Sequence, residues 1–317
     1  MTKKMTEVSN KLVPQVLFWQ GKSYEECGSI VDIIAVKNGL KPLFVSITDS
    51  RKKIEALRKI CQRMKLVFEY KSYKTISEAK YNQIFSSRSN TRYNIYISKD
   101  PKLIKRAKKM MSRGFTLNKG YDYKDFNSLL GYPFCCVESF LKDKSAVEDL
   151  KPYISNKIPF YNNNLLTGTI SNCHLSSYEP CSYNCKKTSQ LNKRILAAIK
   201  KEIPDYYQFL TKYLKKPLLI WIDDQRPEFG LLDSLISIVF EGILKNGILK
   251  YKKIYPHFPI NKSINLLNSP SEKDLYFLTE GNKLVIEKKY IKIYKNDFFL
   301  HKIKRSQYSA ILIQPTP

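Results

Sequence analysis

Two adjacent cysteines in the middle of the chain are the residues whose type and spacing best suit chemistry. Cys135 and Cys136 follow a Gly-Tyr-Pro sequence, and proline suits the first turn of a helix. Thiols in a first turn lie near unpaired backbone N–H groups and the positive end of the helix dipole, which stabilise a thiolate. Because thiolates bind metals and attack electrophiles, this pair is a candidate for metal binding or thiol chemistry.

A second pair of cysteines, Cys181 and Cys185, follows Pro180 at the start of a predicted helix that runs on through Ile199. Residues four apart share one helix face, with Cβ atoms about 5 to 6 Å apart. An unstrained disulfide needs about 3.5 to 4.5 Å between these atoms. A metal or cluster that spans the two sulfurs suits the spacing better.

The two pairs together supply four thiolates from two predicted helix starts, which is enough to close a site. Cys173 and His174 lie a few residues upstream of the second pair and could replace one ligand or surround the site. Zinc sites use Cys-x₂₋₄-Cys spacings, whereas a vicinal pair is unusual for zinc or iron–sulfur, and neither familiar ferredoxin spacing is present. The sequence therefore predicts an iron–sulfur cluster or a zinc ion, with the cluster as first choice. Buried thiols and metal-free redox chemistry stay open as alternatives.

Three residues beside the cysteines are candidates for catalytic groups, namely Tyr132, Glu138 and Ser182. Glu138 could act as an acid or base at a metal-bound group, although a solvated helix residue is the commoner role. Cys27 and Cys61 fall on apolar helix faces, so we expect both to be core residues.

Sequence motifs of several enzyme classes are absent. The chain has no Gly-x-Gly-x-x-Gly, no Gly-x-Ser-x-Gly, no His-Glu-x-x-His and no Cys-x₃-Cys-x₂-Cys. With 3 histidines, a His-rich metal site is excluded.

The formal net charge of +27 favours an anionic partner such as nucleic acid, but the type of basic residue weakens this interpretation. Lysines number 45 and arginines 10, a bias typical of AT-rich codons, whereas phosphate and base recognition tends to favour arginine. The strongest basic patch is the helix predicted over residues 101–113, which is better explained as the solvated face of an amphipathic helix.

No signal peptide is predicted, because no apolar run follows the basic N-terminal residues. The longest apolar segment, residues 229–244, contains Asp233 and Glu241 and is too short to span a bilayer. The sequence thus predicts a cytoplasmic protein without membrane contact, whose 7 cysteines are free, metal-bound or catalytic.

Strand and helix patterns predict an α/β fold in three regions, either separate or within one compact domain. Residues 1–115 alternate strands (16–19, 43–47, 66–70, 93–98) with helices, which is typical of a layer with a parallel sheet. Residues 116–205 form a cysteine-rich helical region. Residues 206–317 read as α+β, with a strand at 217–222, a buried helix at 229–244 and an antiparallel meander at 284–301 that turns at 295–297.

Three motifs resemble the uncharacterised prokaryotic domain-of-unknown-function family numbered 483. They are Leu-Gly-Tyr-Pro-x-Cys-Cys-Val-Glu-x-Phe at 130–140, Pro-Cys-Ser-x-x-Cys at 180–185 and Ile-Ser-Lys-Asp-Pro at 97–101. The resemblance covers about residues 97–188. It implies a shared site, with a histidine two residues before Pro180 in many members, where this chain has Tyr178. The site residues that it implies are Gly131, Tyr132, Pro133, Cys135, Cys136, Pro180, Cys181, Ser182 and Cys185.

The function predicted from the sequence is metal or iron–sulfur binding through Cys135, Cys136, Cys181 and Cys185. We expect the site to belong to an enzyme of a biosynthetic or modification pathway that acts on a small molecule or a protein. The alternatives are a zinc-stabilised nucleic-acid-binding protein and a carrier of metal or sulfur.

Overall fold

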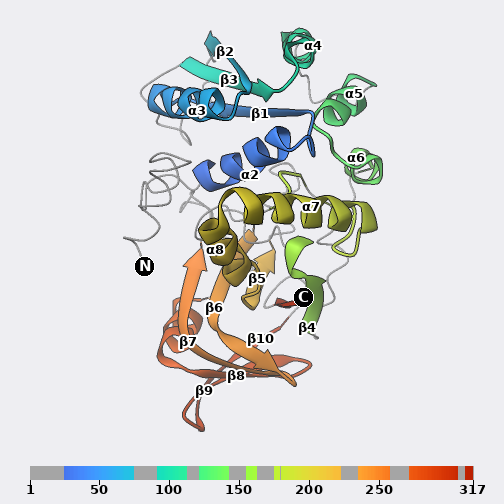
Figure 1. Ribbon diagram of the computed structural model, residues 1–317. Helices are drawn as coiled ribbons and strands as arrows, with labels where there is room; N and C mark the ends of the chain where they lie inside the picture. Colours follow the sequence, from blue (N-terminus) through green and yellow to red (C-terminus); the bar gives the residue numbers. More distant parts are fainter. Residues whose placement is uncertain are drawn as a thin grey trace. The chain divides into compact units, whose positions relative to one another are not determined.

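The computed structural model (Figure 1) describes residues 25–74, 91–112, 121–142, 155–162, 175–178, 180–222, 235–257, 271–305 and 311–316. Two compact units divide the chain. The first comprises residues 1–143 and 190–208, and the second comprises residues 144–189 and 209–317. The division falls within α7 (Lys186–Glu202) and α8 (Pro204–Leu214). None of the helices in the described parts of the chain is long and apolar enough to cross a membrane.

The first unit contains a three-stranded sheet in the order β1-β3-β2. Its strands are β1 (Leu43–Thr48), β2 (Val67–Lys74) and β3 (Thr91–Ser98). The accompanying helices are α2 (Glu25–Lys37), α3 (Arg51–Arg63), α4 (Pro101–Ser112), α5 (Tyr121–Leu129) and α6 (Phe134–Leu141). Mixed α/β structure is therefore confirmed for this region.

Local sequence signals explain the helices α3 and α4. The Ser50 side chain caps α3 by accepting a hydrogen bond from the backbone N of Lys53, and the Asp100 carboxylate accepts one from the N of Lys102 at the start of α4. In α3 the predicted apolar face is buried, from Ile54 to Cys61. Both helices begin directly after these capping residues.

The prediction of a parallel sheet in this region is wrong. Both β1 and β2 pair antiparallel with β3, which lies between them. A helix, α3, separates β1 from β2, so these two strands run in the same direction, as a crossover requires. Strand β3 lies between them and runs in the opposite direction, so β1 and β2 do not pair with each other.

Helices cover both faces of this sheet. Tyr96 of β3 packs in a core cluster with Ile104 and Ala107 of α4. Neighbouring residues in a strand point to opposite faces, and Ile95 and Ile97 are also fully buried. On that side, α2 contacts both β1 and β3.

The second unit contains an eight-stranded sheet in the order β10-β9-β8-β7-β6-β5-β11-β4. The strands are β4 (Ser155–Pro159), β5 (Leu218–Ile222), β6 (Leu235–Lys245), β7 (Ile248–His257), β8 (Lys283–Ile286), β9 (Tyr290–Lys295), β10 (Phe298–Lys304) and β11 (Ile311–Thr316). The β11–β4 pair is parallel, and the other pairs are antiparallel. A 3-10 helix, η2 (Phe160–Asn162), and α9 (Glu272–Glu280) belong to the same unit.

The buried helix predicted over residues 229–244 is wrong, because residues 235–245 form strand β6. An apolar run cannot by itself distinguish a buried strand from a buried helix. The sequence did contain a signal that favoured the strand. Asn246 and Gly247 follow the run with φ of 50° and 74°, and they form the two-residue turn that joins β6 to β7.

The antiparallel meander predicted near the end of the chain is confirmed as β8, β9 and β10. Its second turn has Asn296 and Asp297 at φ of 54° and 81°, at the predicted position. The predicted strand at 217–222 is β5. The strand predicted at 16–19 lies outside the described residues.

Candidate metal centre

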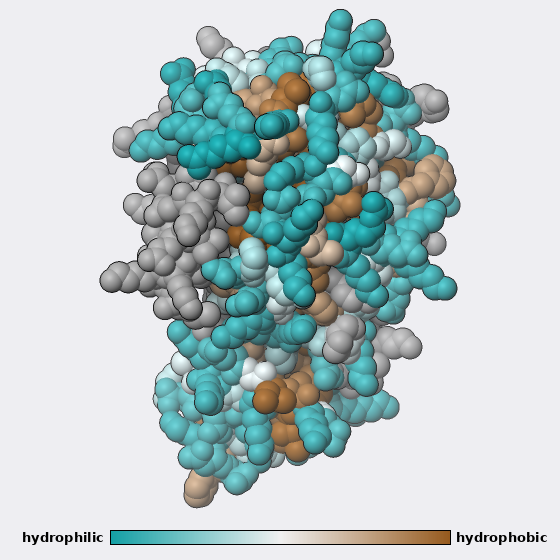
Figure 2. Space-filling model, in the orientation of Figure 1, coloured by the Kyte–Doolittle hydropathy of each residue, from teal (hydrophilic) through white to brown (hydrophobic). Residues whose placement is uncertain are grey.

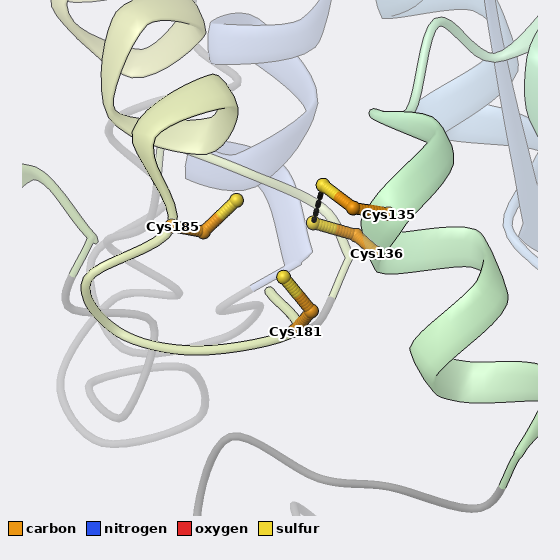
Figure 3. Close-up of side chains that lie close together, drawn as sticks. All are labelled: Cys135, Cys136, Cys181 and Cys185. Carbon is orange, nitrogen blue, oxygen red and sulfur yellow. Dashed lines mark hydrogen bonds between the residues drawn. The ribbon is translucent and has the colours of Figure 1, made fainter.

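Four cysteine side chains lie together in the structure (Figure 3). The Sγ atoms of Cys135, Cys136, Cys181 and Cys185 are all within 4.8 Å of one another. Figure 3 shows the sulfurs of all four pointing toward one another, two from α6 and two from the turn that precedes α7. None of the four forms a disulfide.

The first pair lies at the start of α6. Pro133 is the residue that precedes the helix, and its carbonyl oxygen accepts hydrogen bonds from the backbone N of Cys136 (2.9 Å) and of Val137 (3.1 Å). The proline therefore sets the direction in which the helix begins. The Sγ atoms of Cys135 and Cys136 lie 4.0 Å apart.

Gly131 fixes the tight turn between α5 and α6. Its φ is 76°, which favours glycine, and a Cβ at this position would lie 2.7 Å from Cδ of Pro42. The backbone N of Tyr132 donates to the carbonyl of Asn127 at the end of α5. The Gly-Tyr-Pro sequence thus brings the helix start close to the loop that leads into β1.

The second pair does not lie on a helix face, and this part of the prediction is wrong. Helix α7 begins at Lys186, and Cys181 and Cys185 lie in the turn before it. Ser182 explains the difference, because its Oγ accepts a hydrogen bond from the N of Asn184 (3.2 Å) and its carbonyl accepts one from the N of Cys185 (3.0 Å). Such local bonds compete with a helix. A turn brings the two thiols together.

Asn162 anchors this turn. Its side-chain Nδ2 donates to the carbonyl oxygen of Tyr183 (2.7 Å) and to Oγ of Ser189 (2.8 Å), and Ser189 Oγ in turn donates to the carbonyl of Cys185 (2.9 Å). Asn162 and Tyr183 are 1% and 2% exposed. The turn that carries the second pair is therefore held from inside the protein, by a residue that sequence reasoning did not single out.

The four thiols differ in their access to solvent. Cys136 and Cys185 are buried, and Cys135 and Cys181 are half-buried. Each pair thus provides one enclosed sulfur and one that is partly open. An ion bound to all four would be enclosed on the side of Cys136 and Cys185, and solvent would reach it on the side of Cys135 and Cys181.

A buried ion pair lies beside the Gly-Tyr-Pro turn. Lys41 Nζ donates to Oδ1 of Asp32 at 2.5 Å, both side chains are at most 4% exposed, and Nζ lies 5.1 Å from the ring centroid of Tyr132. Burial by itself lowers the pKa of Lys41, but the charge of Asp32, the nearby Tyr132 and the hydrogen bond to Asp32 together raise this pKa above its ordinary value. Lys41 therefore stays charged and holds the loop before β1 against the Gly-Tyr-Pro turn.

Residues 91–214 match the model of the family described as Protein of unknown function (DUF483). The DUF483 match includes all four cysteines, Gly131 and Asn162, and it extends the predicted range of 97–188 at both ends. The resemblance to this family is confirmed over the matched residues. No curated protein and no solved structure gives a significant match.

The other residues singled out from the sequence lie as follows. Glu138 on α6 forms an ion pair with Lys124 at 3.7 Å, with side chains 37% and 45% exposed. Ser182 takes part in the turn described above, and the Tyr132 ring lies under Lys41. Cys173 and His174 lie outside the described residues. Of the two predicted core cysteines, Cys61 is fully buried, whereas the side chain of Cys27 is outside the described part.

Proposed function

We propose that this protein is a metal-binding protein in which the thiolates of Cys135, Cys136, Cys181 and Cys185 hold one metal ion, with zinc as first choice. The observation that carries the proposal is the mutual distance of at most 4.8 Å among the four sulfurs. A zinc–sulfur bond is about 2.3 Å long, so a tetrahedral site places its sulfurs about 3.8 Å apart. Cys135 and Cys136, at 4.0 Å, are already close to that separation.

The same distances weigh against the iron–sulfur cluster that was the first choice from sequence. A cluster places several iron and sulfide atoms between the cysteines, which separates the thiolates more widely than a single ion does. Four thiolates around one ion suit zinc, and they also suit a single iron. The cluster therefore becomes the second candidate.

A complete set of four thiolates favours a structural role for the ion. Zinc sites with four protein ligands are closed, whereas catalytic sites keep one position for water or substrate. The ion would connect residues 135–136 with residues 181–185, and closing a loop of this length removes conformational freedom from the unfolded chain. We expect the metal to stabilise the cysteine motifs in the arrangement of Figure 3.

An enzyme of a biosynthetic or modification pathway, with Tyr132, Glu138 and Ser182 as catalytic candidates, stays a prediction, as do the small-molecule or protein substrate and the cytoplasmic location. A catalytic role would require one thiolate to leave the ion. Cys135 and Cys181 are the two whose partial exposure suits such an exchange.

The first experiment is to purify the protein without oxygen and to measure zinc, iron and acid-labile sulfide per chain. We expect one zinc, no sulfide, and replacement by cobalt with the intense visible bands of a tetrahedral thiolate site. Iron together with sulfide would establish a cluster instead. Absence of any bound metal, under conditions where zinc is supplied, would contradict the proposal.

Matched variants locate the ion. Cys136→Ala and Cys185→Ala each remove one buried ligand, and we expect both to lose the metal. Cys61→Ala removes a buried thiol of α3 that is not in the cluster and whose pKa burial raises to about 12, so this control should keep one metal per chain. Equal metal loss in the control and the ligand variants would show that the metal is bound elsewhere or that loss follows from unfolding.

A further inference from the structure

The strands β7 to β10, together with the last residues of β6 from 243 on, have one face in the core and one face toward solvent. On the inner face, Leu249, Leu284, Ile291 and Ile293 are fully buried and join a core cluster with Leu278 of α9. Residues between them in each strand point the other way. In the lower part of Figure 2, over these strands, hydrophobic residues reach the surface among hydrophilic ones. We call the solvent side of β6 to β10 the outer face.

Lysines are concentrated on the outer face. Strand register pairs Lys250 with Lys283 and Lys292 with Lys302, while Lys304 lies opposite Tyr290 and Lys245 opposite Ile248. The lysines of the outer face are therefore Lys245, Lys250, Lys283, Lys292, Lys302 and Lys304.

Two pairs of like charges directly opposite each other destabilise a sheet. Acidic residues at the rim compensate for part of this cost, because Asp297 pairs with Lys283 (2.5 Å) and Glu287 with Lys292 (2.6 Å). Among the described residues, no ion pair is recorded for Lys250 or Lys302. A bias toward lysine codons, together with the alternation of strand residues, accounts for lysines on this solvent side, but it does not account for the two pairs placed directly opposite each other.

Aromatic rings lie among these lysines. Tyr290 and Tyr294 alternate with Lys292 along β9, and Phe299 of β10 is paired with Tyr294. The Nζ of Lys302 lies 5.0 Å from the ring centroid of Tyr290, and that of Lys283 lies 5.0 Å from the ring of Tyr294. Phe299 is 55% exposed. The outer face thus offers ring surfaces and positive charges in the same small area.

We propose that the outer face of β6 to β10 binds single-stranded nucleic acid. Lysines would contact phosphates, and Tyr290, Tyr294 and Phe299 would stack on bases. Sheets that bind single strands combine these two features, a positive surface that follows the backbone and aromatic side chains that accept bases of any sequence. The assignment does not depend on a metal at the cysteines, because every residue in it lies in residues 243–304.

The basic helix α4 is a weaker candidate for the same partner. Two of its basic residues are paired with acids, since Arg106 contacts Asp125 at 2.8 Å and Lys108 contacts Glu69. The ring nearest to Lys108 is that of Tyr96, which is fully buried and offers no surface to a base. This helix therefore serves as the control surface in the test.

The test measures fluorescence anisotropy of a labelled 16-nucleotide oligouridine with the full chain at several salt concentrations. Each phosphate contact to a single strand contributes about −0.7 to the slope of log affinity against log salt. We expect the double variant Lys250→Gln, Lys302→Gln to make the slope less steep by about 1.4. The matched variant Lys102→Gln, Lys105→Gln on α4 removes the same charge and should leave the slope unchanged. Equal effects of the two variants would overturn the placement on the outer face.

Base stacking is tested separately from charge. Tyr294→Ala should weaken oligouridine binding by about 5- to 150-fold, whereas Tyr294→Phe, which keeps the ring, should bind like the unchanged protein. Binding of oligothymidine as well as oligouridine fits the proposal, since both are single strands. Preference for a duplex, binding to vesicles of anionic lipid without binding to either oligonucleotide, or no loss in Tyr294→Ala would each overturn it. Circular dichroism confirms that the variants are folded.

Discussion

The three-stranded sheet of the first unit and the meander of the second are both antiparallel, but they bury their residues differently. In β3 the successive residues Ile95, Tyr96 and Ile97 are all fully buried. In β9 burial alternates, with Ile291 and Ile293 in the core and the residues between them half-buried. One sheet is covered on both faces, and the other keeps one face open.

The two sheets therefore have different roles in the protein. The covered sheet positions other elements, because Phe126 and Leu129 of α5 pack in its core cluster and the turn to α6 and the first thiol pair follows directly. The open sheet holds its own side chains toward solvent, where a partner can reach them. Three matched pairs of substitutions test this contrast, each with one member in a closely packed setting and one on the open face of β6 to β10 or in a turn of these strands.

The largest contrast is expected for two tyrosines. Tyr96→Ala in β3 leaves a cavity in a covered sheet and should lower the free energy of unfolding by about 3 to 5 kcal/mol. Tyr294→Ala on the open face should lower it by less than about 1 kcal/mol. Urea unfolding followed by circular dichroism measures both. Losses of similar size would show that the outer face is covered after all.

Two glycines with nearly the same φ form the second pair. Gly131 (φ 76°) and Gly247 (φ 74°) both favour glycine, and an alanine in this region of φ costs about 1 to 2 kcal/mol at either position. At Gly131 the new Cβ would also lie 2.7 Å from Pro42, whereas at Gly247 the nearest atom is 3.7 Å away. We expect Gly131→Ala to cost about 2 to 4 kcal/mol in total, with reduced metal content. Equal losses in urea unfolding would contradict the crowding at Gly131.

Two asparagines extend the contrast to hydrogen bonds. Asn162→Ala leaves the carbonyl of buried Tyr183 without this donor, which should cost about 1 to 3 kcal/mol and weaken zinc binding about 10- to 100-fold. Asn282 bonds Asn296 at an exposed turn, so Asn282→Ala should cost less than about 1 kcal/mol and leave zinc affinity unchanged. Competition with a chromophoric chelator measures the affinity. Unchanged affinity in Asn162→Ala would remove its role in holding the cysteine turn.

Local patterns predicted most of the regular structure. The helical spacing of Ile54, Leu57 and Cys61 corresponds to α3, and the alternation in residues 290–295 corresponds to β9. These segments bury one face each, so the period of their apolar residues is sufficient to distinguish a helix from a strand.

Predictions failed where pairing partners far along the chain decide the structure. In β6 the successive residues 237–240 are all fully buried, so this part of its apolar run carries no alternation, and the Asn-Gly turn after the strand was the available signal. The direction of β3 likewise depends on its position between two strands. Neither is determined by residues within one segment.

The candidate site was predicted only in part for the same reason. Composition and motif spacing singled out the four cysteines, because thiols are rare and chemically distinct. Asn162 is 21 residues from Tyr183, whose carbonyl it binds. Lys41 precedes β1 in the sequence, whereas Tyr132, which it contacts, follows α5. Asparagine and lysine are common in this chain, so their types gave no signal.

The position of β11 has a consequence for the order in which the second unit assembles during synthesis. This strand is the last of the eight along the chain, yet it lies between β5 and β4. Thr316 binds the carbonyl of Ile158, a residue made 158 positions earlier. At ribosomal rates of about 5 to 20 residues per second, β4 waits on the order of ten seconds for its neighbour. Asn162, which anchors the cysteine turn, follows β4 closely in the sequence. During that interval the turn has therefore been synthesised, but the strand next to its anchor has not yet paired with β11.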